Sequence, residues 1–497
     1  MHKIPRRILI GFGALLLALG LVGLIAWELL SSALEAKYLA KSAQKMTWQV
    51  RPGPSDRIRY PGDGPYDVRL GYSKLPVYLQ RLDQAGWQID AQAKIRVQME
   101  RAHDLGLFLP YREKDQAGLG LLDSDGEPFY QGRFPTRGYS RFEDIPKVLV
   151  DALLYIENRE LLAEEYPTRN PAVEWDRLAG ALLEKGVSLV DRGRNVPGGS
   201  TLATQIEKYR HSPAGRTSSM GEKLRQMATA SLRAYLDGPN TLEMRRRTVT
   251  AYLNTVPLAA APRFGEVNGI GDGLWAWYGL DFDETNRSLK QPEAHTGDAV
   301  KNPADAEAAQ ASALKHALSL IVAERRPSYY LAANRKALDA LTDDHLDLLA
   351  NANLIPRDLA DRAKDVKLRG PGQRIAPPAP SFVEQKAANA LRIRVGALLG
   401  ESRLYDLDRL DLQVHTTINQ PAQQIVSRQL QDLAKPKAAA AAGLIGHRLL
   451  QPGNPLDSVI YSFTLYEKTP AGNLLRVQSC RARGGRRRWC SFSAPCR

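Results

Sequence analysis

The longest uncharged stretch of this sequence, residues 8–27, constrains its fold more than any other feature. Twenty residues of helix at about 1.5 Å each cover ~30 Å, the thickness of the hydrocarbon core of a bilayer. Basic residues precede the stretch (Lys3, Arg6 and Arg7), which favours a cytoplasmic N-terminus with the rest of the chain outside. We therefore expect residues 1–39 to form a cytoplasmic N-terminus and a transmembrane anchor.

A cleaved signal peptide is the alternative for this segment. Residues 31–33, Ser-Ser-Ala, resemble a cleavage site. The apolar core of a signal peptide is shorter, however, at ~7–15 residues. The length of the stretch therefore favours an anchor that stays attached.

The charge of the chain limits its possible partners, and its use of cysteine limits the compartment in which it works. The 497 residues carry a formal net charge of +14, and six arginines but no acid lie in 479–497, so the rest carries +14 − 6 = +8. That excess suits an anionic membrane surface or a phosphate-bearing ligand, and no nucleic-acid motif supports a nucleic-acid partner. All three cysteines lie in the same tail, and a body without thiols fits an oxidising compartment. We interpret 479–497 as out-of-frame sequence that replaces a further domain, with a natural basic tail as the alternative.

Hydrophobic periodicity and turn residues divide the rest of the chain. Residues 40–143 are rich in turns and predict a stalk and a small α+β region, with a hairpin at 118–130. Residues 144–365 place apolar side chains at helical spacing and predict one all-α domain without strands. A linker rich in proline and glycine, 366–380, leads to an incomplete α+β region at 381–478.

More detailed expectations follow from the same patterns. After a first helix from Asp144, helices of the all-α domain are expected at 173–185, 223–235, 242–253, 271–278, 304–323 and 332–349. Beyond the linker we expect a half-buried strand at 410–418, a helix at 421–433 and a hairpin at 459–478.

One segment of the helical domain, 196–208, changes from glycine-rich to helical within a few residues. Glycine permits close backbone approach, and Ser200 or Thr201 can cap the helix that follows, leaving its first N–H groups free for an anion. A plain helix cap explains the same residues. The segment alone therefore leaves both interpretations open.

Four motifs follow one another in this domain: Ile-Glu-Asn-Arg at 156–159, Gly-Gly-Ser-Thr-Leu-Ala-Thr-Gln-Ile-Glu-Lys at 198–208, Tyr-Leu-Asn-Thr-Val at 252–256, and Gly-Ile-Gly at 269–271 with Trp-Tyr-Gly at 277–279. In order and spacing they resemble the motifs of the peptidoglycan glycosyltransferases of family 51, found in class A penicillin-binding proteins and monofunctional transglycosylases. The resemblance implies a mainly α protein. Its lysozyme-like transglycosylase domain would stand behind an N-terminal transmembrane helix, with small α+β flanking regions and no transpeptidase domain.

The resemblance also implies a reaction, its partners and its place. The enzyme would polymerise lipid II on the outer face of the cytoplasmic (inner) membrane, in the periplasm, by inverting transfer to a growing glycan strand with release of polyprenyl pyrophosphate. Membrane lipid and other cell-wall synthesis proteins are the further partners expected. A divalent metal (Mg²⁺ or Mn²⁺) is expected as cofactor by resemblance, and no residues are assigned to a structural metal site.

Matching residues receive roles through the same resemblance. Glu157 is the expected general base, and cations are expected to hold the pyrophosphate (Lys208, Arg216 and Lys223). Further substrate contacts are expected from Gly199, Ser200, Thr201, Gln205 and Asn254. For Gln205 and Asn254 a purely local hydrogen-bonding role is an equal alternative.

Three departures from the family pattern bear on activity. Asn158 stands where the family has aspartate, and Thr250 stands where it has glutamate. The second catalytic acid corresponds to Gln226, with Glu222 as the alternative. Two further readings therefore stay open beside the polymerase: a lytic glycan-cleaving enzyme, and a catalytically inactive membrane-anchored scaffold for cell-wall assembly.

Overall fold

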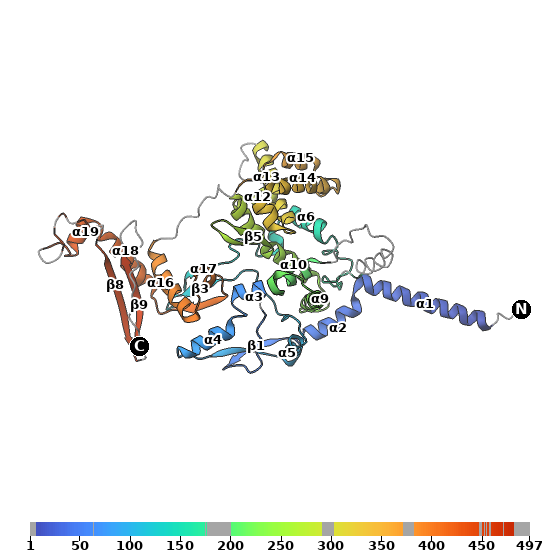
Figure 1. Ribbon diagram of the computed structural model, residues 1–497, viewed down its shortest axis with the longest axis horizontal. Coiled ribbons are helices and arrows are strands. Elements are labelled where there is room, and N and C mark those ends of the chain that lie inside the picture. The colour runs from blue at the N-terminus through green and yellow to red at the C-terminus, as the bar shows by residue number, and fades with distance from the viewer. Residues whose placement is uncertain are drawn as a thin grey trace. The chain divides into compact units, whose positions relative to one another are not determined.

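The computed structural model (Figure 1) describes residues 6–62, 64–173, 175, 200–290, 303–370, 382–446, 450–451, 453, 455–456, 459–470 and 472–481. The chain forms two compact units. The first comprises Met1–Pro76, Trp87–Gln116 and Phe134–Ile375, and the second comprises Val77–Gly86, Ala117–Arg133 and Ala376–Arg497. Several predictions lie outside the described residues: most of the helix at 173–185, Gly199, most of the linker at 366–380 and the tail after residue 481.

The first unit begins with two helices, α1 (Arg6–Ser31) and α2 (Ala33–Ala43). Ser32 between them adopts a left-handed backbone with φ of 49°. The Glu28 carboxylate accepts hydrogen bonds from the first N–H groups of α2, at 2.9 Å each. Within the described residues no single helix is both long and apolar enough to cross a membrane, whereas Leu15–Ser31 and Ala33–Ala43, bent by 51°, meet that requirement together.

Short elements follow α2 in the first unit. Strand β1 (Trp48–Pro52) pairs antiparallel with β2 (Ala91–Ile95). Two small helices accompany them, α3 (Pro65–Leu70) and α5 (Val97–Asp104). Arg59 lies in the loop between β1 and α3. It binds Glu100 of α5 at 2.6 Å and so holds that loop against the helix.

Helices dominate the rest of the first unit. They are α6 (Lys147–Glu157), α8 (Leu202–His211), α9 (Met220–Ala234), α10 (Leu242–Thr255), α11 (Gly269–Gly273), α12 (Phe282–Lys290), α13 (Pro303–Ala323), α14 (Arg335–Asn351) and α15 (Arg357–Asp365). Single turns connect some of them: η1 (Phe142–Asp144), η2 (Pro213–Gly215), and the π-helical turns η3 (Leu274–Tyr278) and η4 (Ser328–Ala333). The predicted helices at 223–235, 242–253, 304–323 and 332–349 are thus confirmed to within a few residues.

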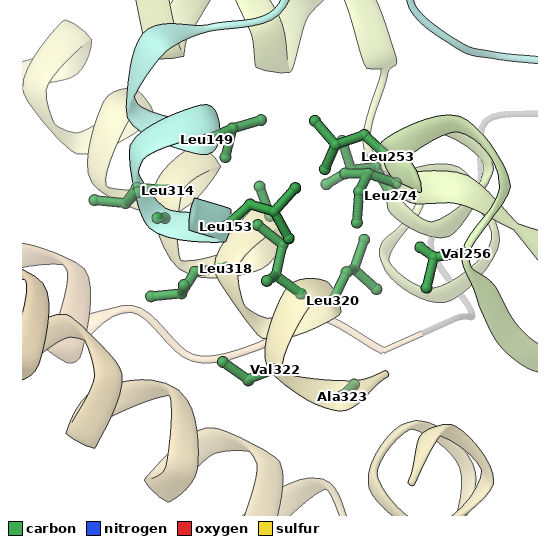
Figure 2. Close-up of a cluster of buried hydrophobic side chains, with 14 of the residues drawn as sticks. Leu149, Leu153, Leu253, Val256, Leu274, Leu314, Leu318, Leu320, Val322 and Ala323 are labelled. Carbon is green, nitrogen blue, oxygen red and sulfur yellow. The ribbon is translucent and has the colours of Figure 1, made fainter. Parts of the chain in front are cut away.

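Helix α13 runs through the centre of this helical core. Leu314, Leu318 and Leu320 are fully buried and belong to the same hydrophobic cluster as Leu153 of α6 and Leu274 of η3 (Figure 2). From Ala311 onward α13 is buried on nearly every side, because α6, α12, α14 and α15 pack against it. Its many alanines keep the side chains short.

The prediction that no strand interrupts this domain is wrong. Strands β5 (Pro257–Ala261) and β6 (Gly265–Asn268) form an antiparallel hairpin after α10. Gly269 follows with φ of 78°, and a Cβ there would lie 2.2 Å from the backbone oxygen of Asn254. The expected single helix at 271–278 is likewise α11 followed by the π-helical turn η3.

The second unit contains a three-stranded sheet in the order β4-β3-β7. Strand β3 (Leu119–Leu122) pairs antiparallel with β4 (Pro128–Gln131), which confirms the predicted hairpin, and parallel with β7 (Leu412–His415). Its helices are α4 (Leu75–Gln84), α16 (Phe382–Leu399), α17 (Leu404–Leu407), α18 (Gln420–Asp432) and α19 (Pro436–Ala441). The predicted hairpin near residue 470 is also confirmed, as β8 (Tyr461–Thr469) and β9 (Gly472–Arg481).

Candidate active site

Glu157 is the last residue of α6, and its side chain is only 11 % exposed. One carboxylate oxygen, Oε2, accepts a hydrogen bond from Gln205 Nε2 at 3.0 Å. The other, Oε1, is buried and accepts no hydrogen bond from any residue that the structure describes. The nearest cation is the Arg325 guanidinium, with Nη2 3.6 Å from Oε1. A carboxylate held through one oxygen, while the other accepts no hydrogen bond from the described residues, suits a general base.

Helices α8 and α10 set the position of that carboxylate. Thr201 caps α8 by accepting a hydrogen bond from the Thr204 N–H, so its hydroxyl serves the helix start. One turn later, Gln205 accepts a hydrogen bond from the buried Tyr252 hydroxyl of α10 through Oε1 at 3.3 Å. Gln205 is therefore fixed on one side by Tyr252 while it donates to Glu157 on the other.

A second carboxyl group, Glu324, lies in the same cluster and was not among the residues predicted from sequence. It directly follows α13. Burial and the negative charge of Glu157 raise the pKa of Glu324, against the opposing effects of Lys208, Tyr252 and Arg325. The sequence signal for it is slight: a charged triplet, Glu-Arg-Arg at 324–326, that ends a long apolar helix.

Two of the three predicted pyrophosphate-binding cations come together. Lys223 on α9 donates from Nζ to Ser200 Oγ at 2.5 Å. Burial and the charge of Lys208 lower the pKa of Lys223, so the two ammonium groups lie within electrostatic range. Lys208 also acts on Glu324, which connects these cations to the carboxylates. Arg216, by contrast, is exposed after η2, and its side chain makes no hydrogen bond or ion pair with a described residue.

The two candidates for a second acid on α9 lie in a hydroxyl network. Glu222 accepts a hydrogen bond from Ser212 Oγ at 2.6 Å. Gln226 donates from Nε2 to Ser212 Oγ at 2.8 Å and to Thr217 Oγ1 at 3.0 Å. Both side chains are buried, and these bonds hold the turn after α8 onto α9. The geometry favours a positioning role for both residues.

Asn254 and Thr250 of α10 also serve the local structure. The side-chain amide of Asn254 makes two hydrogen bonds with the Tyr139 backbone. Oδ1 accepts from the Tyr139 N–H and Nδ2 donates to the Tyr139 carbonyl oxygen, each at 2.8 Å. Asn254 thus takes the local role that the sequence left as one of two alternatives. Thr250 donates to the Arg246 carbonyl at 3.1 Å and lines a cavity of about 510 Å³ that Glu157 does not border.

Asn158, which stands where the family has aspartate, is 1 % exposed. Neither its Oδ1 nor its Nδ2 has a hydrogen-bond partner among the described residues. Together with Arg245 it borders a cavity of about 10 Å³. The departure from aspartate therefore affects a buried position next to the base.

A buried ion cluster, formed by Asp67, Glu113, Asp115, Glu207, Arg210, His211 and Arg233, fixes the orientation of α8. Glu113 binds Arg210 at 2.6 Å, His211 at 2.6 Å and Arg233 at 2.7 Å. The charges of these partners hold the pKa of Glu113 well below its usual range, although burial alone would raise it. Because α8 also carries Gln205 and Lys208, this cluster sets where those side chains lie.

The donor groups at the site do not fit a metal ion held by the protein alone. Among the described residues no three His, Cys, Asp or Glu side chains are grouped to hold one. Glu157 and Glu324 act on one another electrostatically, but Lys208 also acts on Glu324 and Arg325 lies 3.6 Å from Glu157, and both positive charges would oppose binding of a metal cation. The divalent metal stays an expectation from resemblance, and no step below passes through it.

The helical core carries the buried glutamate at the end of α6 within the segment that contains the four motifs. A family model described as Transglycosylase matches residues 126–342, which is consistent with a transglycosylase domain in this part of the chain. The matched segment contains Glu157, Gln205, Lys208, Lys223 and Glu324. A comparison with curated proteins found no match. A domain of this family supports peptidoglycan glycosyltransferase activity in general.

Proposed function

We propose that the protein polymerises lipid II into glycan strands by inverting transfer, with release of polyprenyl pyrophosphate. The observation that carries the proposal is Glu157: a buried carboxylate with Oε2 held by Gln205 and with Oε1 free of hydrogen bonds from the described residues, inside a transglycosylase-family segment.

The chemistry follows from the charges around that carboxylate. The 4-hydroxyl of one lipid II attacks C1 of the muramyl sugar at the end of the growing strand, while Glu157 takes the hydroxyl proton. The bond from C1 to the pyrophosphate oxygen breaks, and negative charge grows on the leaving group. Lys208 and Lys223 stabilise that charge, since preorganised cations act most strongly where charge develops.

The proposal includes a place in the cell. Apolar side chains along α1, such as Leu17, Leu19 and Val22, are more than half exposed, which suits a lipid environment better than water. We propose that α1 anchors the protein in the cytoplasmic membrane with both units outside, where membrane lipid and other wall-synthesis proteins are its neighbours. A lipid-linked substrate would then reach the site from the same membrane.

The decisive experiment replaces the base. Glu157→Gln keeps size and hydrogen bonding but cannot take a proton, and loss of a general base costs about 10²–10⁴-fold in rate. The detergent-solubilised wild type and Glu157→Gln are incubated with labelled lipid II, and separately with preformed glycan strands. Glu164→Gln, at an exposed acid that pairs with Arg246 at 3.5 Å, is the matched control and should keep full activity.

The outcomes separate the proposed function from its alternatives. Glycan growth that Glu157→Gln abolishes supports the polymerase. Shortening of preformed strands by the wild type identifies a lytic enzyme instead. A folded wild type that does neither but binds lipid II identifies an inactive scaffold, and glycan growth that survives in Glu157→Gln means that another residue is the base.

A further inference from the structure

Two exposed apolar side chains lie beside one of the expected anion-binding lysines on helix α9. Met220 is 74 % exposed and Leu224 is 58 % exposed. Together with Lys223 they occupy the i, i+3 and i+4 positions that share one face of a helix. The first turns of α9 therefore present two apolar side chains and one ammonium group on one side, which we call the Met220–Leu224 face.

The other charged side chains of these turns lie on a different side of the helix. The Glu222 side chain is buried and accepts a hydrogen bond from Ser212 Oγ at 2.6 Å. The Arg225 guanidinium lies 3.7 Å from the Glu222 carboxylate. Among residues 220–225, which the structure describes, Lys223 is thus the only charged residue of the Met220–Leu224 face. No carboxylate of these turns stands on this face to repel an anion.

Lys223 connects this face to the rest of the site. Its Nζ donates a hydrogen bond to Ser200 Oγ at 2.5 Å, directly before the start of α8. Helix α8 carries Gln205, which donates a hydrogen bond to Glu157 at 3.0 Å. An anion held at Lys223 would therefore lie next to the Met220–Leu224 face and near the start of the helix that supports the base.

The combination of a cation with apolar neighbours indicates the chemistry of the ligand. Single exposed apolar side chains are common on proteins and by themselves indicate no ligand. A hydrated anion gains nothing from apolar neighbours, whereas a pyrophosphate bonded to an apolar chain gains from both kinds of group. Met220 and Leu224 are one helical turn apart, about 6 Å along the axis, so a chain of two five-carbon prenyl units can contact both.

We propose that Met220 and Leu224 bind the first prenyl units of the polyprenyl chain, while Lys223 binds the pyrophosphate that carries this chain. The assignment rests on the proposed function, because its ligand is the leaving group of that reaction. Contact with the two apolar side chains removes part of the chain from water, which favours a prenyl pyrophosphate over one without a chain. The Met220–Leu224 face thus determines specificity and takes no part in the chemical step.

Binding of two small pyrophosphates to the full-length, detergent-solubilised protein tests the assignment. Methyl pyrophosphate and geranyl pyrophosphate carry the same anion, and only the second carries a prenyl chain. Isothermal titration of the wild type at one fixed detergent concentration should show about tenfold tighter binding of geranyl pyrophosphate, because its chain leaves water. The double variant Met220→Ser/Leu224→Ser should lose this preference and bind methyl pyrophosphate like the wild type. Lys223→Ala should bind both ligands more weakly.

The matched control is Leu348→Ser, at a leucine of α14 that is 48 % exposed, and it should keep the preference for geranyl pyrophosphate. Equal binding of the two ligands by the wild type overturns the assignment. A double variant that keeps the preference overturns it as well, and is expected if the face contacts the bilayer or a second copy of the chain instead. Glycan growth by a wild type without the preference leaves the proposed function standing. A wild type that shows the preference but forms no glycan from lipid II supports the prenyl site and contradicts the proposed polymerisation.

Discussion

At the residue scale, Lys208 and Lys223 are two like charges within electrostatic range of one another. Burial and the Lys208 charge lower the pKa of Lys223, so a pyrophosphate anion bound between them would relieve a repulsion. Lys223→Ala should weaken binding of inorganic pyrophosphate about ten- to a hundredfold, since a charge-assisted contact contributes roughly 1.5–3 kcal/mol. Binding should also fall with rising pH earlier than an ordinary lysine would cause.

Isothermal titration of the folded variants with pyrophosphate measures this effect. Lys208→Ala should behave like Lys223→Ala. Lys147→Ala, at a lysine that is 87 % exposed, is the control and should bind like the wild type. Equal affinity in all four proteins would show that Lys208 and Lys223 do not bind pyrophosphate.

Sequence motifs predicted some residues of this site. The others could not be predicted, because their positions depend on how the helices pack. Glu157, Gln205 and Lys208 come from motifs whose spacing follows the helices that carry them. Glu324 is separated from Glu157 by 167 positions, and only the packing of α13 against α6 brings the two together. In the other direction, Asn254 matched a motif, but the Tyr139 backbone takes both ends of its amide.

At the element scale, the buried ion cluster around Glu113 ties helices α8 and α9 to the segment before the helical core. Both ring nitrogens of His211 face carboxylates, Asp67 at 2.8 Å and Glu113 at 2.6 Å. Burial alone would lower the pKa of His211, but the Glu113 charge and the hydrogen bonds raise it to about 10. The imidazole is therefore protonated at neutral pH and acts as a cation between the two carboxylates.

This shift predicts how stability depends on pH. A folded-state pKa of about 10 lies above the value near 6.5 for an unfolded histidine, so the contribution of His211 is complete below pH ~6.5. It is lost as the pH rises toward 10, at up to about 1.4 kcal/mol per pH unit. His211→Gln should be less stable than wild type at pH 6, and the difference should shrink by pH 10.

Urea unfolding at several pH values measures that difference. The control is His103→Gln, at a partly exposed histidine of α5, and its curve should run parallel to the wild type. A His211→Gln curve that also runs parallel to the wild type between pH 6 and 10 would mean that His211 is neutral in the folded protein.

Elements with a strong apolar period were predictable from the sequence, and elements made by local backbone geometry were not. Helices α9, α10, α13 and α14 lie within a few residues of their predicted ends. Hairpin β5–β6 was missed because its first strand, Pro-Leu-Ala-Ala-Ala, has no β-branched residue and no alternation of polar and apolar side chains. The chain reverses between these strands over residues 262–264, and Arg263 there and Gly265 at the start of β6 both have positive φ, 62° and 95°.

At the scale of the whole molecule, the apolar N-terminal helix is fastened to the helical domain through α2. Ala36, Ala40 and Ala43 are buried against Leu232 and Tyr235 of the α9 region. Glu35 accepts hydrogen bonds from the Asn170 amide at 2.6 Å and from the Trp175 indole at 2.9 Å. A helix anchored in lipid would thus hold the first unit at the membrane surface without a free tether.

Because α1 is attached to the helical domain in this way, the orientation of α1 in the membrane decides on which side that domain lies. If Lys3, Arg6 and Arg7 stay in the cytoplasm, a reporter that is active only outside the cytoplasm should be active when fused after residue 140. A reporter that works only in the cytoplasm should be inactive at the same position. Replacing the three basic residues by glutamate is the matched perturbation: it removes the positive charge that orients α1 and should lower the activity of the first reporter. Activity of the cytoplasmic reporter in the wild type would place the helical domain inside the cell. The proposed synthesis of glycan on the outer face of the membrane would then be wrong.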